Sequence, residues 1–458
     1  MTISRPSPDG GRFKYTAHHL NFTVSSSSPP NIKTGMEVGK KLRIAVVGGG
    51  VCGLTCALAL AKEGIQVEVF EAAASFAEIG AGVGFGPNAV RILQDIGILD
   101  NVLSECGEPE ASLRSFIFYS GMEGHEMVID YPTNTRDLGL GLHRASFLNA
   151  LVKNIDQKHT HNRKRCTRVS QGESRRGPVI HFEDGTAYEA DVVLGADGIK
   201  SVVRNALIRE GLEPPIGYSN TCCFRGLVPI EDVISAGVVT DLTRRPVCFI
   251  GFDKHIIIFP IKGSTVINVV AFATDRTLNI GEAPRPEGEP WVLPLSTNEL
   301  LAEYKGWGSD VLKILGCIQA PSKWLIHVVY PPLSSYVKGR IALLGDSAHA
   351  MLPHLGAGAG QALEDAYLLA KLLSHPLTND ENVELVLQAY DHTRRKRAQM
   401  IWECSRAAGE KYEGRGEHGY TLQGLREDLR DLWEPVWRHE LSTDVQEALS
   451  YLRTRGVF

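Results

Sequence analysis

A glycine motif at residues 48–53 leaves this chain few folds to adopt. It reads Gly-Gly-Gly-Val-Cys-Gly and matches the pattern G-x-G-x-x-G. The apolar run Leu42–Val47 precedes it and has the composition of a strand buried on both faces of a parallel sheet. Small and apolar residues at Val51–Lys62 predict a helix packed closely on that sheet, and Val67–Glu71 predicts the next strand. This strand–helix–strand unit predicts an α/β fold with a doubly wound parallel sheet.

The same motif predicts a phosphate-binding turn. In such a turn Gly48 makes the sharp change of direction, Gly50 lets backbone N–H groups approach a pyrophosphate, and Gly53 lets helix and strand pack closely. Glu71 ends the second predicted strand and is placed to accept hydrogen bonds from a ribose diol. A glycine-rich turn without a ligand is the alternative. The motif does not distinguish NAD from FAD, because both contain ADP.

Two further predicted strands end in glycine-containing motifs. The apolar run at residues 192–197 ends in Gly195-Ala196-Asp197-Gly198. The run at residues 341–344 ends in Gly345-Asp346-Ser347-Ala348-His349, and the loop Pro-His-Leu-Gly-Ala-Gly-Ala-Gly follows at residues 353–360. Carboxyl ends of parallel strands meet at one edge of a sheet, where ligands of such folds bind.

The segment between the second and third motifs has a different character. Its runs Val247–Phe252, His255–Ile261 and Thr265–Thr274 are strand-like and joined by short turns, which predicts a mostly antiparallel sheet. We expect a β-sheet domain at 219–330, inserted into an α/β domain at 41–218 and 331–382, with a helical region at 383–458. An amphipathic helix is expected at Asn88–Leu99, and the basic cluster Arg394–Arg397 is interpreted as a solvated helix face.

Together the three motifs resemble those of the single-component FAD-dependent aromatic hydroxylases with the p-hydroxybenzoate-hydroxylase fold, most closely the salicylate-hydroxylase branch and its fungal relatives. The resemblance runs from Leu42 to about Arg397. It implies a doubly wound Rossmann-type FAD domain, an inserted β-sheet substrate domain and a helical C-terminus. It also implies a monooxygenase that uses NADPH or NADH as a transient reductant. Through a flavin C4a-hydroperoxide, such an enzyme transfers oxygen from O2 to a small phenolic or aromatic acid, with or without decarboxylation.

Specific cofactor contacts follow from the resemblance. Asp346 matches an aspartate that accepts a hydrogen bond from the ribityl chain, and Arg144 matches an arginine that contacts the flavin. The Gly/Ala-rich loop after Pro353 lets backbone N–H groups approach the flavin edge on which negative charge develops during reduction. The segment Asp197–Arg204 is expected to pack on the flavin and to meet the nicotinamide. The predicted FAD-binding residues are Gly48, Gly50, Gly53, Glu71, Arg144, Asp197, Asp346, Pro353, Gly356, Ala357, Gly358 and Ala359.

Three residues are candidates for handling the substrate. Arg225 resembles an arginine with which fungal relatives hold a phenolate or carboxylate, a task that suits the bidentate guanidinium. His255 is a candidate proton relay to a substrate phenol, whose deprotonation makes the ring electron-rich; a structural strand histidine is the alternative. His354 is a candidate for lining the pocket. Phe259 stands where some relatives carry a tyrosine, which argues against a tyrosine-assisted mechanism.

Composition restricts the partners. A net charge of −5 gives no reason to expect nucleic acid. Nine scattered cysteines without a C-x-x-C pair argue against a metal site or a disulfide framework and favour a reducing compartment, the cytoplasm. No run approaches the ~18 apolar residues of a membrane span. Residues 1–40, rich in Ser, Pro and Gly, are expected to be disordered. The expected partners are a small aromatic substrate and O2, and a homodimer is left open.

Three other functions share some of these sequence features. A dearomatising or epoxidising flavin monooxygenase of secondary metabolism shares the same motifs. A flavin-binding protein without catalysis is less compatible with Arg225. Gly345-Asp346-Ser347 superficially matches the motif of GDSL-type hydrolases, but that motif lies near the start of those domains, and this chain has no G-x-S-x-G elbow.

Overall fold

The glycine motif lies at the carboxyl end of the first strand of a six-stranded sheet. The computed structural model describes residues 42–75, 82–132, 138–172, 177–208, 215–283 and 290–458. The tail predicted to be disordered, residues 1–40, lies outside the described residues. In spatial order the strands are β18 (Val337–Lys338), β19 (Ile341–Leu343), β11 (Val192–Gly195), β1 (Ile44–Val47), β2 (Val67–Phe70) and β7 (Thr160–His161).

All pairs in this sheet are parallel except β18–β19, and the two later motifs follow β11 and β19. The three motifs therefore meet at one edge of the sheet, as the sequence predicted. The first helix, α1 (Val51–Lys62), packs against α9 (Gly358–Leu373). A three-stranded sheet packs on Phe70 through the rings of Phe182 and Tyr188. Its strands are β8 (Cys166–Ser170), β9 (Val179–Phe182) and β10 (Ala187–Glu189).

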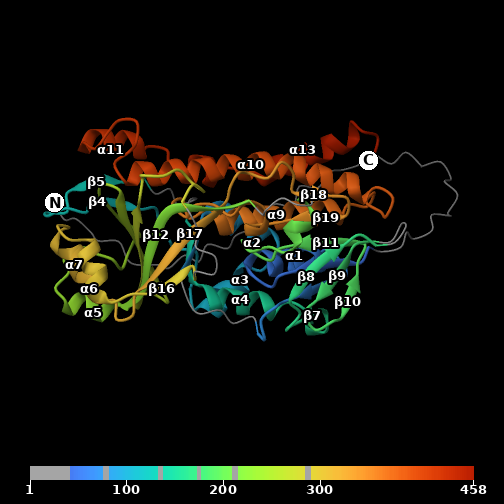
Figure 1. The fold of residues 1–458 in the computed structure, drawn as a ribbon, viewed down its shortest axis with the longest axis horizontal. Helices are drawn as coiled ribbons and strands as arrows, with labels where there is room; N and C mark the ends of the chain where they lie inside the picture. Colours follow the sequence, from blue (N-terminus) through green and yellow to red (C-terminus); the bar gives the residue numbers. More distant parts are fainter. Residues whose placement is uncertain (1–41, 76–81, 133–137, 173–176, 209–214, 284–289) are drawn as a thin grey trace, which may run out of the picture. The chain divides into compact units, whose positions relative to one another are not determined.

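The second large sheet has eight strands and is mostly antiparallel, as predicted (Figure 1). It also includes two strands from before residue 219, which the sequence had not assigned to it. In spatial order the strands are β16 (Val292–Pro294), β17 (Ser322–Val329), β12 (Ile216–Pro229), β15 (Val266–Thr274), β14 (Lys254–Ile261), β13 (Val247–Ile250), β4 (Ile117–Ser120) and β5 (Met127–Asp130).

The two faces of the eight-stranded sheet have different neighbours because side chains alternate along each strand. Phe224, Ile258 and Val269 belong to a core shared with three helices, which are α5 (Ile230–Ser235), α6 (Thr297–Glu303) and α7 (Ser309–Gly316). The opposite face carries Arg225 and Val270, which line a cavity. This alternation determines which residues of the sheet can meet a ligand.

Smaller elements complete the region between the sheets. A two-stranded sheet pairs β3 (Gly82–Phe85) with β6 (Leu140–His143). The helices here are α2 (Pro87–Asp95), α3 (Leu99–Cys106), α4 (Arg144–Val152) and α8 (Asp346–His349). The single helix expected at 88–99 is in fact two, because Gly97 adopts a left-handed conformation with φ of 71° and ends the first of them.

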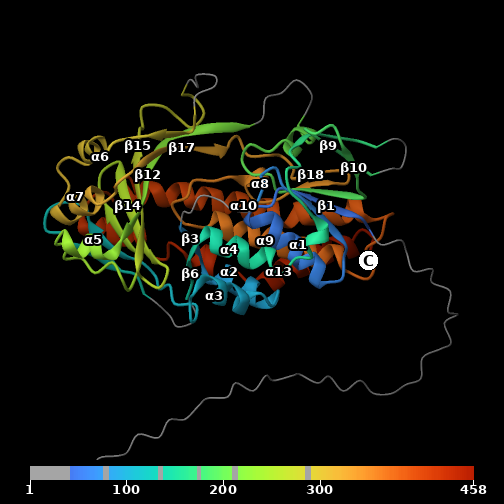
Figure 2. The ribbon, with the colours of Figure 1, turned by 90° about the horizontal axis from the view of Figure 1, so that it is seen from below.

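The C-terminal region is helical, as predicted, and its first helix runs beside both large sheets (Figures 1 and 2). This helix, α10 (Val383–Tyr412), gives Val386 to the core under the six-stranded sheet and Tyr412 to the core beside the eight-stranded one. It is followed by α11 (Leu422–Leu429), α12 (Glu434–Trp437) and α13 (Leu441–Arg453). Among the described helices, none combines the length and apolar character needed to cross a bilayer.

The basic cluster on α10 is a solvated face only in part: Lys396 is exposed, but the interpretation was wrong for Arg394 and Arg397. The Arg394 side chain is fully buried and pairs with Glu364 and Asp365 at 2.8 Å each. Arg397 is also buried and binds Glu364 at 2.7 Å. These acidic residues lie on α9, whose sequence gave no sign that they would face α10. The pairs join the two helices, because a buried charge needs a partner of opposite sign.

Candidate functional site

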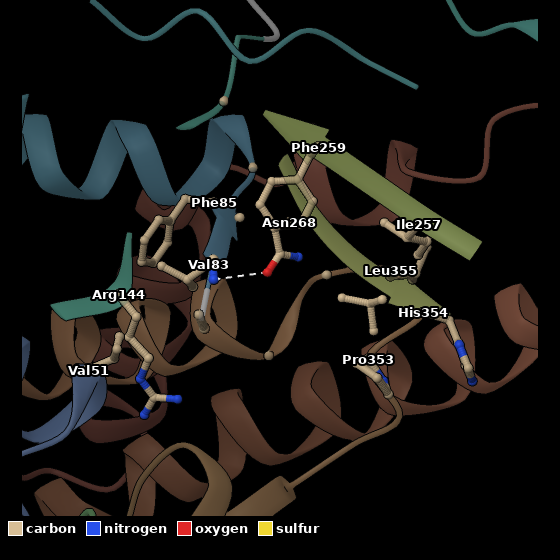
Figure 3. A pocket seen from close by; sticks show the side chains of 18 of the residues that line it. Val51, Val83, Phe85, Arg144, Ile257, Phe259, Asn268, Pro353, His354 and Leu355 are labelled. Atoms are coloured by element: carbon tan, nitrogen blue, oxygen red, sulfur yellow. Dashed lines mark hydrogen bonds between the residues drawn. The ribbon is translucent and has the colours of Figure 1, made fainter. Parts of the chain in front are cut away.

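A cavity of about 480 Å³ lies between the carboxyl edge of the six-stranded sheet and one face of the eight-stranded sheet. Figure 3 shows Val51 and Arg144 at one side, Ile257 and Phe259 on the sheet, and the loop carrying His354 opposite them. The walls are largely apolar, with a few polar side chains directed inward, which is typical of a small-molecule site.

The glycine motif forms the turn that the sequence predicted. Gly48 has a φ of 106°, and a Cβ there would lie 2.3 Å from the carbonyl oxygen of Ala196. A Cβ on Gly53 would lie 1.9 Å from the carbonyl oxygen of Gly48. A Cβ on Gly50, in contrast, would have no atom within 4 Å, and Gly50 lines the cavity at the amino end of α1. The turn therefore leaves open the space in which a helix N-terminus stabilises a phosphate.

Glu71 fixes this turn from the neighbouring strand. Its carboxylate accepts hydrogen bonds from the backbone N–H groups of Gly49 at 2.6 Å and Ala73 at 2.7 Å. Each carboxylate oxygen keeps a second lone pair for a further donor. The predicted contact with a ribose is compatible with this arrangement and stays a prediction.

Asp346 differs from Glu71 in having no internal partner. It is exposed and lines the cavity, and its carboxylate makes no hydrogen bond within the described part of the chain. In the following loop Pro353, Gly356, Gly358 and Ala359 line the cavity, whereas Ala357 is buried in the core and precedes α9. The amino end of this long helix therefore also opens onto the cavity.

The side chain of Asp197 is directed toward residues 201–203 and does not line the cavity. Its carboxylate accepts hydrogen bonds from Ser201 Oγ at 2.6 Å and from the N–H groups of Val202 and Val203 at 2.7 and 3.1 Å. Burial raises the pKa of this carboxyl group, although the hydrogen bonds oppose the shift. The adjacent Ala196 and Gly198 line the cavity, so Asp197 holds the turn that presents them.

The charged side chains that line the cavity are three arginines and one aspartate, namely Arg114, Arg144, Arg225 and Asp346. Arg225 extends from β12 on the same face as Cys223, with its guanidinium 5.2 Å from the centre of the Trp324 ring. Among the described residues no carboxylate pairs with Arg225. Burial lowers the pKa of its guanidinium, and the charge of Arg144 lowers it further. The cavity is therefore suited to an anion.

The two predicted histidines lie together, but only one of them reaches the cavity. His354 lines it, and His255 lies behind, fully buried, with its ring centre 5.0 Å from that of His354. Burial and the neighbouring His255 lower the pKa of His354 to about 3, so this ring is neutral. Neither Nε2 of His255 nor Nδ1 of His354 has a hydrogen-bond partner in the described structure.

Sequence reasoning missed the residue that anchors this pair. Glu413, at the end of α10, accepts a hydrogen bond from His255 Nδ1 at 3.0 Å and another from Thr274 Oγ1 at 2.9 Å. Arg276 completes the group and is part-exposed, so it connects Glu413 with solvent. Glu413 is 158 residues from His255 in the chain, and no local pattern links them.

The sequence also gave no indication of an aromatic wall from the C-terminal region. Trp433 and Trp437 line the cavity, and their rings stack at 5.2 Å. Phe116 also stacks on Trp433, at 5.1 Å, and lines the cavity. The three rings are nearly parallel and give this wall an apolar, aromatic character, which suits a planar aromatic ligand.

These residues fit a flavin dinucleotide. The open space at Gly50 and the amino end of α1 suit a pyrophosphate, Asp346 suits a chain of hydroxyl groups, and the amino end of α9 suits the electron-rich edge of an isoalloxazine. Such groups are distributed along one cavity, as an extended cofactor requires.

Comparison with known proteins agrees with this geometry. The FAD binding domain family matches residues 41–218 and 315–405, more than half of the chain. A salicylate hydroxylase of Pseudomonas putida is 40% identical over 426 residues, covering 90% of this chain and 95% of the relative. A 6-methylsalicylate 1-monooxygenase of Aspergillus terreus is 32% identical over 393 residues, covering 81% and 83%.

A solved structure is similar over nearly the same range. The substrate complex of a salicylate hydroxylase superposes with a TM-score of 0.78 at 34% identity, covering 89% of this chain and 98% of that one. The family match confirms FAD as the cofactor that the sequence predicted, and the same comparisons confirm the predicted fold class. This chain therefore belongs to the FAD binding domain family, and it is an FAD-dependent monooxygenase of the aromatic-hydroxylase type.

Proposed function

We propose that the enzyme hydroxylates a small aromatic acid of the salicylate class, with Arg225 binding its carboxylate. The observation that carries this proposal is the half-buried guanidinium of Arg225, which no described carboxylate neutralises, in a cavity lined by three arginines. Relatives named for salicylate and 6-methylsalicylate support the same substrate class. A guanidinium recognises a carboxylate through two parallel hydrogen bonds.

FAD, when bound, accepts two electrons from NADPH or NADH and activates O2. We propose that the chain holds it through Gly50, Arg144, Asp346 and the loop at 353–359. Gly48, Gly53, Glu71 and Asp197 act behind the cavity by fixing the backbone turns. This division follows from which of the residues line the cavity.

His354 and His255 are proposed to move the phenolic proton of the substrate. A neutral imidazole accepts a proton at one ring nitrogen and releases one from the other, which permits relay without a lasting charge. Glu413 would stabilise positive charge on His255, and Arg276 would connect the group to solvent. Removal of the proton makes the ring electron-rich, as attack on activated oxygen requires.

The overall reaction conserves atoms and electrons. One oxygen atom of O2 enters the ring, and the other leaves as water. If oxygen enters at the carbon that bears the carboxylate, CO2 leaves and a catechol forms; if it enters at a ring C–H, the acid is retained. A product that keeps its carboxylate but has lost the aromatic ring system would instead identify a dearomatising monooxygenase.

A direct test measures NADPH and NADH oxidation by the holoenzyme with salicylate, together with product mass. We expect stimulated consumption and a hydroxylated or decarboxylated product. In Arg225→Ala, KM should rise by at least ~10-fold and coupling of NAD(P)H oxidation to product should collapse, because a charged hydrogen bond is lost. FAD content should stay normal. Arg225→Lys is the matched variant, because lysine keeps the positive charge but cannot donate the two parallel hydrogen bonds of a guanidinium. Unchanged turnover in Arg225→Ala would remove this residue from the mechanism.

We also propose that the enzyme works in the cytoplasm. All nine cysteines are free thiols, and six of them are buried. Thiols in this number persist in a reducing compartment.

A further inference from the structure

Asn268 is a polar residue in the middle of an apolar strand. It lies on β15, whose sequence is Val-Ile-Asn-Val-Val-Ala-Phe-Ala-Thr, and its side chain is 2% exposed. It shares a face with Val270 and Phe272, and all three line the cavity. A carboxamide in such a place needs hydrogen-bond partners for both its oxygen and its nitrogen.

The orientation of this carboxamide is fixed by the neighbouring backbone. Asn268 Oδ1 accepts a hydrogen bond from the N–H of Gly82 at 3.1 Å. Because a backbone N–H can only donate, the oxygen must face Gly82 and the NH2 group must face away from it. The fit is close, since a Cβ on Gly82 would lie 3.0 Å from both Cβ and Cγ of Asn268.

The amide nitrogen has no partner of its own. Asn268 Nδ2 is buried and makes no hydrogen bond to any part of the chain that the structure describes. Figure 3 shows this nitrogen on the side of the carboxamide opposite the dashed hydrogen bond, directed toward Ile257 and Leu355. A buried donor without an acceptor is unfavourable, so a ligand that brings an acceptor oxygen is expected there.

The strand register places this donor near Arg225. Arg225 lies opposite Val270, and Asn268 lies opposite Leu227, so Arg225 and Asn268 are diagonal neighbours on the same face of the sheet. Such neighbours are roughly 7–8 Å apart, a distance that a long side chain spans. Both side chains present only N–H donors to the cavity.

We propose that Asn268 is a second anchor for the substrate, and that its NH2 group donates to an oxygen of the carboxylate bound by Arg225. The inference rests on the proposed function and adds a specificity-determining residue to it. A carboxylate has enough lone pairs to accept from a guanidinium and from an amide at the same time. Neutral phenols of similar size would bind more weakly, since they bring no anionic oxygen to this pair.

Asn268→Asp is the most informative variant. The aspartate is isosteric and keeps an oxygen for the N–H of Gly82, but it replaces the donor that faces the cavity by an acceptor. We measure Kd from the flavin absorbance change of the holoenzyme, with salicylate as the probe and salicylaldehyde as its neutral counterpart. The expected loss is about 100-fold or more for salicylate in Asn268→Asp and about 10-fold in Asn268→Ala, the range of a hydrogen bond to a charged group. The affinity for salicylaldehyde should fall by a smaller factor than the affinity for salicylate.

The control adds the same charge far from the cavity. Asn101 on α3 is exposed and bonds Asn154 at the surface, and Asn101→Asp should leave both Kd values unchanged. Equal salicylate affinity in wild type and both Asn268 variants would overturn the inference and leave the proposed function intact. So would a shift of FAD affinity or flavin potential without a change in salicylate affinity, because the donor would then serve the flavin. A wild-type holoenzyme that does not bind salicylate would overturn both.

Discussion

Glu413 controls the charge around the two histidines of the site. Burial raises the pKa of its carboxyl group, but the hydrogen bond from His255 and the electrostatic interactions with His255 and Arg276 outweigh burial and lower the pKa to about 2. Glu413 is therefore ionised at neutral pH, and His255 Nδ1 is held as the donor toward it. In the proposed proton relay Glu413 acts on the substrate through His255, so it is a positioning residue.

Glu413→Gln tests this charge through stability. A carboxyl group whose pKa falls on folding stabilises the protein above its unfolded pKa of 4.5, and this contribution disappears as pH falls toward about 2. The shift corresponds to about 3 kcal/mol. We expect the free energy of unfolding of the wild type to fall more steeply with acidification, below about pH 4.5, than that of Glu413→Gln. Urea unfolding at several pH values measures both. Glu410→Gln, on the same helix but part-exposed, is the control. Parallel pH curves for wild type and Glu413→Gln would contradict the prediction.

Several site residues were predictable because each belongs to a local pattern. Gly50, Asp346 and the loop around Gly358 follow predicted strands, and the structure brings them to one cavity. Glu413 and Trp433 were not predictable, because only the packing of α10 and its successors against the eight-stranded sheet brings them there. Asn268 had a usable signal, namely a polar residue inside an otherwise apolar strand.

At the scale of single elements, two glycines of the turn between β1 and α1 differ in what they allow: Gly53 allows close packing, and Gly50 leaves open space. Gly53 allows α1 to pack on β1, because a Cβ would overlap the carbonyl oxygen of Gly48. Gly50 has an ordinary φ of −77° and free space on the side of its missing Cβ. We therefore propose that Gly50 leaves room for a ligand, because its own conformation does not require a glycine.

The two alanine variants should behave in opposite ways. Gly50→Ala should fold with a normal Tm as apoprotein and bind FAD at least ~10-fold more weakly, since its methyl group occupies the space for the pyrophosphate. Gly53→Ala should lower the free energy of unfolding by about 1–3 kcal/mol, the usual effect of overpacking. Flavin absorbance after dialysis and thermal unfolding of the apoproteins measure the two effects. Tight FAD binding by Gly50→Ala would show that this space is not used.

Element boundaries were predicted well where periodicity and glycine agree. The helix predicted at 51–62 has those bounds in the structure, and the strand predicted at 67–71 ends one residue earlier. The helix predicted at 88–99 failed because the apolar pattern continues across Gly97, where the backbone turns. A single glycine weighs little in a periodicity, yet a left-handed residue ends a helix.

At the scale of the whole described molecule, each of the two large sheets is built from strands that lie far apart in the chain. The six-stranded sheet takes β19 from far along the chain, and the eight-stranded sheet takes β4 and β5 from before residue 219. Sequence patterns identify strands but not their partners, because pairing depends on contacts distant in the chain. The domain boundaries at residues 218, 330 and 382 accordingly stay a proposal.

The buried ion pairs on α10 hold this arrangement together. Arg394 binds Glu364 and Asp365 of α9 and also Asp444 of α13, so three helices meet at one guanidinium. Burial lowers the pKa of Arg394, but the three carboxylates outweigh it and raise the pKa, which keeps the side chain charged. Removal of one member leaves buried carboxylates without a counter-charge.

Arg394→Met should therefore destabilise the protein even though Arg394 does not line the cavity. We expect the free energy of unfolding to fall by about 3–5 kcal/mol, as for other broken buried ion pairs. Lys396→Met, two residues further along the same helix, removes an exposed charge that lies 3.7 Å from Glu447; the expected change is within about 1 kcal/mol. Chemical unfolding of the holoproteins measures both. Equal losses in the two variants would mean that the arginine contributes only general helix stability. A loss of stability confined to Arg394→Met would show that the buried ion pairs between α9, α10 and α13 stabilise the fold.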